Sequence, residues 1–225
     1  MSEKIIALLL DSFWKILLPG LVKTIPLTLI SFVLALIIAT VTALVQFARV
    51  PVLTQLARLY IWIIRGTPLL VQLFVIFFGL PKVGIVMEPF PAAILVFAVN
   101  TGAYDAETVR AALESVPRGQ LEAGLCAGLS YWQTMWRIVL PQAMRTAFPS
   151  LSNSLISLTK DTSLAANITV AEMFMTTQRI VARTYEPLVL YIEVGVIYLM
   201  FSTVLTWLQR WGEKRLNVYQ KREAN

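Results

Sequence analysis

The sequence predicts an all-α membrane protein, in which residues 1–225 form a single domain built as a five-helix transmembrane bundle. The composition is 57% hydrophobic and only 14% charged, with a mean hydropathy of +0.71. Soluble domains are close to a quarter charged and slightly under half apolar. Residues 24–48 also form a run of 25 positions without a charge, longer than the roughly 20 that cross a bilayer core. Apolar side chains are therefore expected to face lipid.

The first segment, residues 3–18, is expected to be an amphipathic helix at the membrane interface. Lys4, Asp11 and Lys15 fall on one narrow arc at helical spacing, and apolar side chains occupy the other side. A signal peptide is the alternative, but Asp11 interrupts its apolar stretch and no A-x-A-like cleavage site follows. We therefore expect this helix to lie in the plane of the interface.

Five spans are expected, near residues 20–48, 57–80, 88–112, 138–168 and 186–209. The last four contain uncharged runs of only 14–16 residues. At about 1.5 Å per residue, such a run covers only about 21–24 Å. The charged residues that end these runs are Arg65, Asp105, Lys160 and Glu193. Charges at membrane depth usually face protein or a water-filled cavity, which favours a transporter over an inert anchor.

The distribution of basic residues predicts the orientation. One side of the expected membrane carries eleven lysines and arginines in its connections, and the other carries six. The richer side is expected to be cytoplasmic. This puts the amino terminus outside and the tail 210–225 in the cytoplasm. The net charge of +6 could suggest nucleic acid, but its position at segment ends indicates membrane lipid as the partner and no nucleic acid.

Several kinds of chemistry are excluded by residue content. The chain has no histidine and one cysteine, Cys126, so it has no Ser-His-Asp triad, no His/Cys metal site and no internal disulfide. It also has no G-x-x-x-x-G-K-[ST] motif for binding nucleotide phosphates. We expect no catalytic residue, no metal and no cofactor in this chain. An intramembrane enzyme built on Ser157 and Lys160 is the remaining enzymatic alternative, and it lacks a recognisable active-site constellation.

The longest hydrophilic stretch, residues 105–145, is expected to carry the function. Within it, residues 117–130 should form a short cytoplasmic helix between helix breakers. Pro117 and Gly119 break one helix, and Gly124 and Gly128 loosen the next. Seven residues of the stretch fall at fixed offsets: Glu122, Ala123, Gly124, Gly128, Ile138, Leu140 and Pro141.

These offsets resemble the loop of binding-protein-dependent ABC permeases written E-A-A-x3-G-x9-I-x-L-P, with Gly124 in place of the second alanine. The resemblance implies a type I ABC importer permease fold and a coupling helix that seats in a groove of a cytoplasmic ATPase. In that role Glu122 can pair with a basic residue of the ATPase. Ala123 and Gly124 allow close approach, and Gly128 supplies the turn after the helix.

Further segments resemble the permeases for polar amino acids, such as the histidine, glutamine, arginine and glutamate importers. They are Arg65–Gln72, Ala103–Glu107 with Arg110, Gly119–Ala123, and Asn153 with Lys160–Leu164. The chain as a whole resembles the L-cystine permeases, although no single residue identifies cystine. The family implies two ATPase subunits that bind ATP and magnesium, a periplasmic amino-acid-binding protein, and a second permease subunit, for which an identical copy is favoured.

A candidate substrate path follows from the charges in the fourth span. Lys160 and Asp161 are adjacent and point roughly 100° apart on a helix, so they are poorly placed to pair with each other. A zwitterionic amino acid offers a carboxylate to Lys160 and an ammonium to Asp161, and Thr162 and Ser163 add hydroxyls. The alternative is that Lys160 pairs with Glu107 or Glu193 and only holds the bundle together.

Asn100, Tyr104 and Glu107 complete the candidate path. They lie at i, i+4 and i+7 and therefore share a helix face, which could line a cavity or a neighbouring helix equally well. An ion-coupled secondary transporter remains the alternative function at this stage. Such folds often contain inverted repeats, and no strong repeat is visible in the sequence.

Overall fold

The computed structural model describes residues 2–217, so the last part of the tail, residues 218–225, lies outside the described residues. The described residues contain helices and no β-strand, which confirms the all-α class. The chain forms these α-helices: α1 (Ser2–Pro19), α2 (Ile25–Phe47), α3 (Pro51–Arg65), α4 (Leu69–Phe74), α5 (Pro89–Ser115), α6 (Arg118–Cys126), α7 (Tyr131–Thr134), α8 (Leu140–Asp161), α9 (Met173–Thr184) and α10 (Pro187–Asn217).

Shorter helical turns join several of these helices. The π-helical turns are Gly20–Thr24, Val75–Gly79 and Met135–Val139, and the 3-10 turns are Leu80–Val83 and Thr162–Ile168. Two helical stretches are long and apolar enough to cross a membrane, Glu3–Phe47 and Pro187–Leu216. A third results if α3 and the helical stretch Leu69–Val83 form one broken span. The count of five spans stays a prediction.

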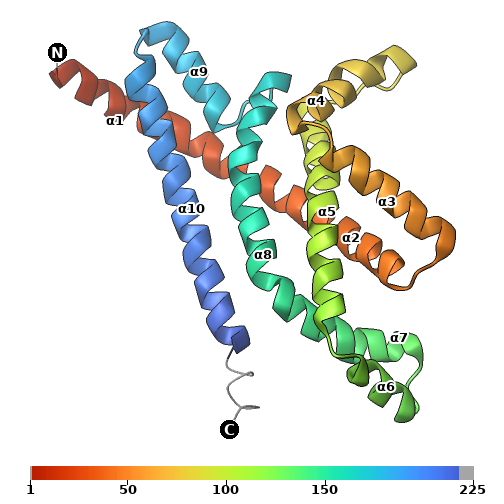
Figure 1. Ribbon diagram of the computed structural model, residues 1–225. Helices are drawn as coiled ribbons and strands as arrows, with labels where there is room; N and C mark the ends of the chain where they lie inside the picture. Colours follow the sequence, from red (N-terminus) through yellow and green to blue (C-terminus); the bar gives the residue numbers. More distant parts are fainter. Residues whose placement is uncertain (1, 218–225) are drawn as a thin grey trace. The chain divides into compact units, whose positions relative to one another are not determined.

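The amino-terminal segment was expected to be a separate interfacial helix over residues 3–18, and the structure differs from this expectation. Figure 1 shows no loop between α1 and α2, because the chain passes through the π turn Gly20–Thr24 without leaving the helix. In this turn the Ile25 N–H donates to the Gly20 carbonyl oxygen. Pro26 follows and has no N–H with which to continue the regular α-helical pattern. A single π turn inside an α-helix can absorb such an interruption.

The expected second span, residues 57–80, is also not one helix. α3 ends at Arg65, and α4 begins at Leu69 after an extended Pro68. Proline disfavours helical backbone in the residue before it, which explains the break. The Gln72 side chain of α4 donates to Thr67 Oγ1 at 2.8 Å, which links α4 to the break that precedes it. This segment is the one that resembles the amino-acid permeases.

The chain divides into two compact units. The first consists of Met1–Val33, Thr67–Ala98 and Leu155–Trp207, and the second of Leu34–Gly66, Val99–Ser154 and Leu208–Asn225, within the described residues.

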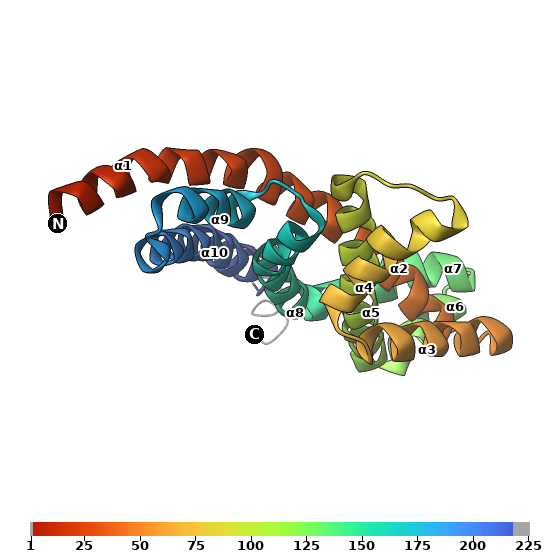
Figure 2. The same ribbon diagram turned by 90° about the horizontal axis from the view of Figure 1, so that it is seen from above.

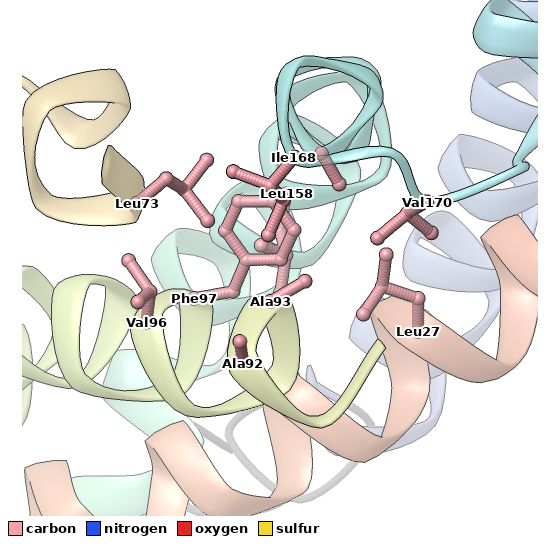
Figure 3. Close-up of a cluster of buried hydrophobic side chains, with 10 residues drawn as sticks. Leu27, Leu73, Ala92, Ala93, Val96, Phe97, Leu158, Ile168 and Val170 are labelled. Atoms are coloured by element: carbon pink, nitrogen blue, oxygen red, sulfur yellow. The ribbon is translucent and has the colours of Figure 1, made fainter. Parts of the chain in front are cut away.

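The first unit has an apolar core around Phe97. Figure 3 shows its ring with Leu73, Leu158 and Ile168 around it, and all four side chains are buried. Burying a large apolar side chain stabilises a fold by about 1.5–3 kcal/mol. Because Leu158 belongs to α8 and Ile168 ends the following 3-10 turn, this core fixes the segment between them.

Polar contacts join the outer helices of the first unit. Figure 2 shows α9 beside α1 and α10. The buried Ser12 of α1 donates to Glu193 Oε2 of α10 at 2.5 Å. At Gly20, a β-carbon would lie 2.9 Å from Phe201 Cε2, so the small residue allows α10 to approach closely. The second half of α1 and the turn after it are therefore held against the unit.

The second unit is held by close contacts of α5. Gly102 lets α5 approach Ile38, because a β-carbon there would lie 2.9 Å from Ile38 Cγ2. The Tyr60 hydroxyl of α3 donates to the Val99 carbonyl oxygen at 2.6 Å. Asp105 is fully buried and accepts a hydrogen bond from Ser154 at 2.5 Å. These contacts place α2, α3 and α8 around α5, which leads directly into α6.

Candidate coupling loop and substrate path

The helix α6 begins immediately after Pro117 in the second unit. Pro117 has an extended backbone, and its carbonyl oxygen accepts the Gln120 N–H at 2.9 Å, which starts the first turn. Glu122 and Ala123 are exposed on α6. Glu122 forms no ion pair within residues 2–217. A carboxylate and a small residue are thus presented together on the outside of a short helix.

The end of α6 is set by Gly128. This residue has a φ of +83°, which glycine adopts without the steric cost that other residues incur. The Leu129 N–H donates to the Gly124 carbonyl at 3.1 Å, and the Gly128 N–H donates to the Leu125 carbonyl at 3.0 Å. This pair of bonds is the Schellman pattern that closes a helix end. Gly128 therefore ends α6 and redirects the chain toward α7.

Gly124 was expected to allow close approach of the ATPase, but it faces the inside of the loop. It is buried, and a β-carbon at this position would collide with the Thr134 side chain. The absence of a side chain at Gly124 thus serves contact with α7, whereas Ala123 stays exposed. The sequence interpretation did not include Thr134, and no local pattern links it to Gly124.

The turn between α6 and α7 is closed by a capping box at Ser130. Its hydroxyl oxygen accepts the Gln133 N–H at 3.3 Å, and its own N–H donates to Gln133 Oε1 at 2.9 Å. Thr134 adds a bond from its hydroxyl to the Ser130 carbonyl at 3.0 Å. The S-x-x-Q spacing is a recognised signal for a helix start, so this feature was readable from the sequence.

Three of the expected path residues lie on α5. Asn100 is buried, Tyr104 is exposed, and Glu107 is half-buried. The guanidinium of Arg65 lies 5.2 Å from the centre of the Tyr104 ring, a cation–π distance. Glu107 Oε2 accepts a hydrogen bond from Arg110 at 2.8 Å.

Glu107 also lines a cavity of about 770 Å³ in the second unit. Arg49 and Arg58 line it together with Arg110 and Glu114. Arg110 bonds both carboxylates, with Glu114 Oε1 also at 2.8 Å. The mixed charge of the walls suits a polar solute. Sequence reasoning missed the arginines from α3 and the preceding turn, although the spacing of Glu107, Arg110 and Glu114 indicates a shared helix face.

The other four path residues lie in the first unit, at the end of α8. Lys160 and Asp161 are exposed and form no salt bridge within residues 2–217. The carboxylates proposed as alternative partners are bonded elsewhere, Glu107 to Arg110 and Glu193 to Ser12. The solute-facing role of Lys160 stays a prediction.

Thr162 and Ser163 begin the 3-10 turn that follows α8. Thr162 is buried and donates to the Thr159 carbonyl oxygen at 2.7 Å, and Ser163 is half-buried and donates to the Lys160 carbonyl oxygen at 2.8 Å. Each hydroxyl oxygen keeps the capacity to accept another bond. Because Thr162 is buried, only the half-buried Ser163 can present its hydroxyl oxygen beside Lys160 and Asp161.

The chain is similar to known transport proteins in sequence and in fold. Residues 31–218 match the family described as binding-protein-dependent transport system inner membrane component. The chain is 47% identical over 210 residues to the L-cystine transport system permease protein TcyB of Bacillus subtilis, across 93% of this chain and 90% of that protein. It is 39% identical over 215 residues to the L-cystine transport system permease protein TcyL of the same organism, across 91% and 90%.

A solved structure supports the fold. The chain superimposes on an amino acid ABC transporter crystallised with histidines, with a TM-score of 0.82 and 30% identity. The match covers 92% of this chain and 96% of that chain. The type I importer permease fold implied by the loop pattern is thereby confirmed.

Proposed function

This chain belongs to the binding-protein-dependent transport system inner membrane component family, and we propose that it is the permease through which an ATP-driven importer carries L-cystine across the bacterial inner membrane. It is the permease component of an amino-acid ABC importer and is not an enzyme, because ATP hydrolysis belongs to the partner ATPase. The family also implies a substrate-binding protein as partner. The alternative of an ion-coupled secondary transporter is therefore set aside.

The identity of 47% to a permease for L-cystine is the observation that supports cystine as the solute. L-cystine carries an ammonium and a carboxylate at each end. Lys160 and Asp161 form no salt bridge within residues 2–217 and offer opposite charges of the kind that such a head group needs. Hydrogen bonds to charged groups contribute about 1.5–3 kcal/mol each, so this pair would contribute substantially to holding the solute.

The coupling role is assigned to α6. In this proposal, two identical permease chains stand side by side, and each docks one of two ATPase subunits, which bind the ATP and magnesium. Closure of the ATPases on ATP moves both α6 helices and shifts the bundle between two states. The exposed Glu122 and Ala123, framed by Pro117 and Gly128, support this role.

Uptake into liposomes tests the solute and the energy source together. The permease, its ATPase and its binding protein are reconstituted, and radiolabelled L-cystine is supplied outside with ATP inside. We expect uptake only with ATP, and stronger competition by unlabelled cystine than by histidine, glutamine or arginine. Uptake driven by an ion gradient without nucleotide would contradict the importer mechanism. Stronger competition by one of the other amino acids would contradict cystine alone.

The proposed orientation puts α6 in the cytoplasm, and Cys126 provides a natural probe. It is the single cysteine of the chain and is exposed on α6. A membrane-impermeant maleimide should label it in inside-out vesicles and not in right-side-out vesicles. Bound ATPase should slow this labelling if α6 is the docking helix.

A matched control reports the opposite face. In a Cys126→Ser background, Arg183→Cys lies on α9, which the topology places outside, and its position is exposed. This variant should react only in right-side-out vesicles. Labelling of Cys126 from the outer face would reverse the orientation.

A further inference from the structure

We propose that the polar cavity of the second unit binds the phosphate of an anionic phospholipid headgroup, and that Arg49 and Arg58 are the residues that hold it. This cavity, of about 770 Å³, is lined by the end of α2, the start of α3 and the last turns of α5. It therefore lies at the end of α5 that leads into α6. Lys160 and Asp161 belong to the other unit, so the inference goes beyond the proposed function and does not depend on the identity of the solute.

The charged residues that line the cavity are unequally satisfied. Arg110 bonds the carboxylates of Glu107 and Glu114, each at 2.8 Å. Arg49 and Arg58 form no ion pair within residues 2–217. Three arginines thus line the cavity with two glutamates, which leaves one positive charge in excess. Because a guanidinium can bind two phosphate oxygens at once, the two arginines without ion pairs are suited to an anion of this kind.

Arg49 has an unusual backbone for an arginine. It lies in the turn between α2 and α3 with a φ of +54°, in the left-handed region that glycine adopts without steric cost. A glycine would fit this turn at least as well, so the turn does not require the arginine side chain. Residues held in such strained backbone often occur at binding sites. The change Arg49→Gly therefore removes the cation without straining the turn.

Two neighbouring faces of α3 match the two parts of a phospholipid. Gln55 and Arg58, three positions apart, share the face that lines the cavity. Val52, Leu56 and Leu59 recur at helical spacing on the adjacent face, and all three are exposed. An apolar face on which acyl chains can lie therefore borders the polar cavity along α3. This arrangement favours the phosphate of a lipid over a soluble phosphate.

The lipid retained by the intact complex tests this inference. The permease–ATPase complex is reconstituted in nanodiscs with equal amounts of phosphatidylglycerol and phosphatidylcholine, and the lipids that remain after mild detergent extraction are counted by native mass spectrometry. Wild type should retain phosphatidylglycerol in preference to phosphatidylcholine. Arg49→Gly and Arg58→Gln should each lower this preference about fivefold, as the loss of one arginine contact with an anionic headgroup implies.

Control variants separate the cavity from general charge and from stability. Arg137→Gln removes an exposed arginine of the same unit that does not line the cavity, and it should retain lipid as wild type does. Arg58→Lys keeps the charge and should keep most of the preference. Arg49→Gly should not lower the melting temperature, because glycine suits the left-handed backbone. Its loss of lipid would then report the missing cation and not a damaged fold.

Two results would overturn the inference directly. One is equal retention of both lipids by wild type, and the other is an unchanged preference in both Arg49→Gly and Arg58→Gln. Displacement of the retained phosphatidylglycerol by inorganic phosphate, at constant ionic strength, would assign the cavity to a soluble anion instead. Uptake of L-cystine is measured separately in liposomes, so each of these failures would leave the proposed function standing.

Discussion

Replacement of Glu122 by lysine is expected to abolish uptake while the permease remains in the membrane. Glu122 is exposed on α6 and has no partner ion within the described residues, so its proposed partner is a basic residue of the ATPase. Charge reversal turns that attraction into repulsion. Disruption of a buried interfacial charge pair costs about 2–5 kcal/mol, so uptake should fall about 30-fold or more.

The measurement compares uptake, ATPase activity and the amount of permease in the same vesicles. Glu186→Lys is the matched control, because this exposed residue lies in the turn between α9 and α10 and undergoes the same charge reversal. It should transport normally. Glu122→Gln should show an intermediate loss, since it removes attraction without adding repulsion. Wild-type uptake by the lysine variant would rule out the coupling role of Glu122.

Replacement of Lys160 or Asp161 by alanine is expected to block passage of the solute with the ATPase still docked. Each side chain is exposed at the end of α8 and lacks a salt bridge within residues 2–217. Each is proposed to hold one charge of the amino-acid head group. Loss of one such contact, worth about 1.5–3 kcal/mol, should reduce uptake at low solute concentration at least about tenfold.

Co-purification of the ATPase shows whether docking survives in these variants. Lys160→Arg and Asp161→Glu keep the charges and should retain part of the uptake. Lys82→Ala removes an exposed lysine elsewhere in the first unit and serves as the neutral control. Unchanged uptake kinetics in both alanine variants would mean that these charges do not contact the solute.

The coupling loop was largely readable from the sequence, because its boundaries depend on local chemistry. Residues 117–130 were expected, and α6 occupies Arg118–Cys126 between Pro117 and Gly128. Proline before a helix and glycine after it act within a few residues of themselves. The contact of Gly124 with Thr134 was not readable, because it depends on how α6 folds back on α7.

The ends of the membrane spans were harder to predict, because they depend on more than local chemistry. Hydropathy indicates where apolar residues lie but not where a helix is interrupted. The interfacial helix was expected to end at residue 18, yet the chain continues through the π turn Gly20–Thr24 into α2. The second span was expected over residues 57–80, yet the chain breaks at Pro68.

The sequence indicated which polar and charged residues belong to the candidate substrate path. It did not indicate which residues of other helices they contact, because those contacts depend on the tertiary structure. Arg110 lies three positions from Glu107, so their ion pair follows from helical spacing. Arg58 and Glu107 line the same cavity only because α3 packs beside α5. No periodicity joins residues on separate helices, so this pair could not be found in the sequence alone.

The continuous entry from α1 into α2 has a practical consequence for measuring motion. α1 is joined to α2 without a loop and is tied to α10 at Ser12 and Gly20. The part of α1 between these two contacts is therefore fixed to the first compact unit. A fluorophore on the exposed Lys15, which lies between them, would report displacement of this unit, so distance changes during turnover could be recorded there.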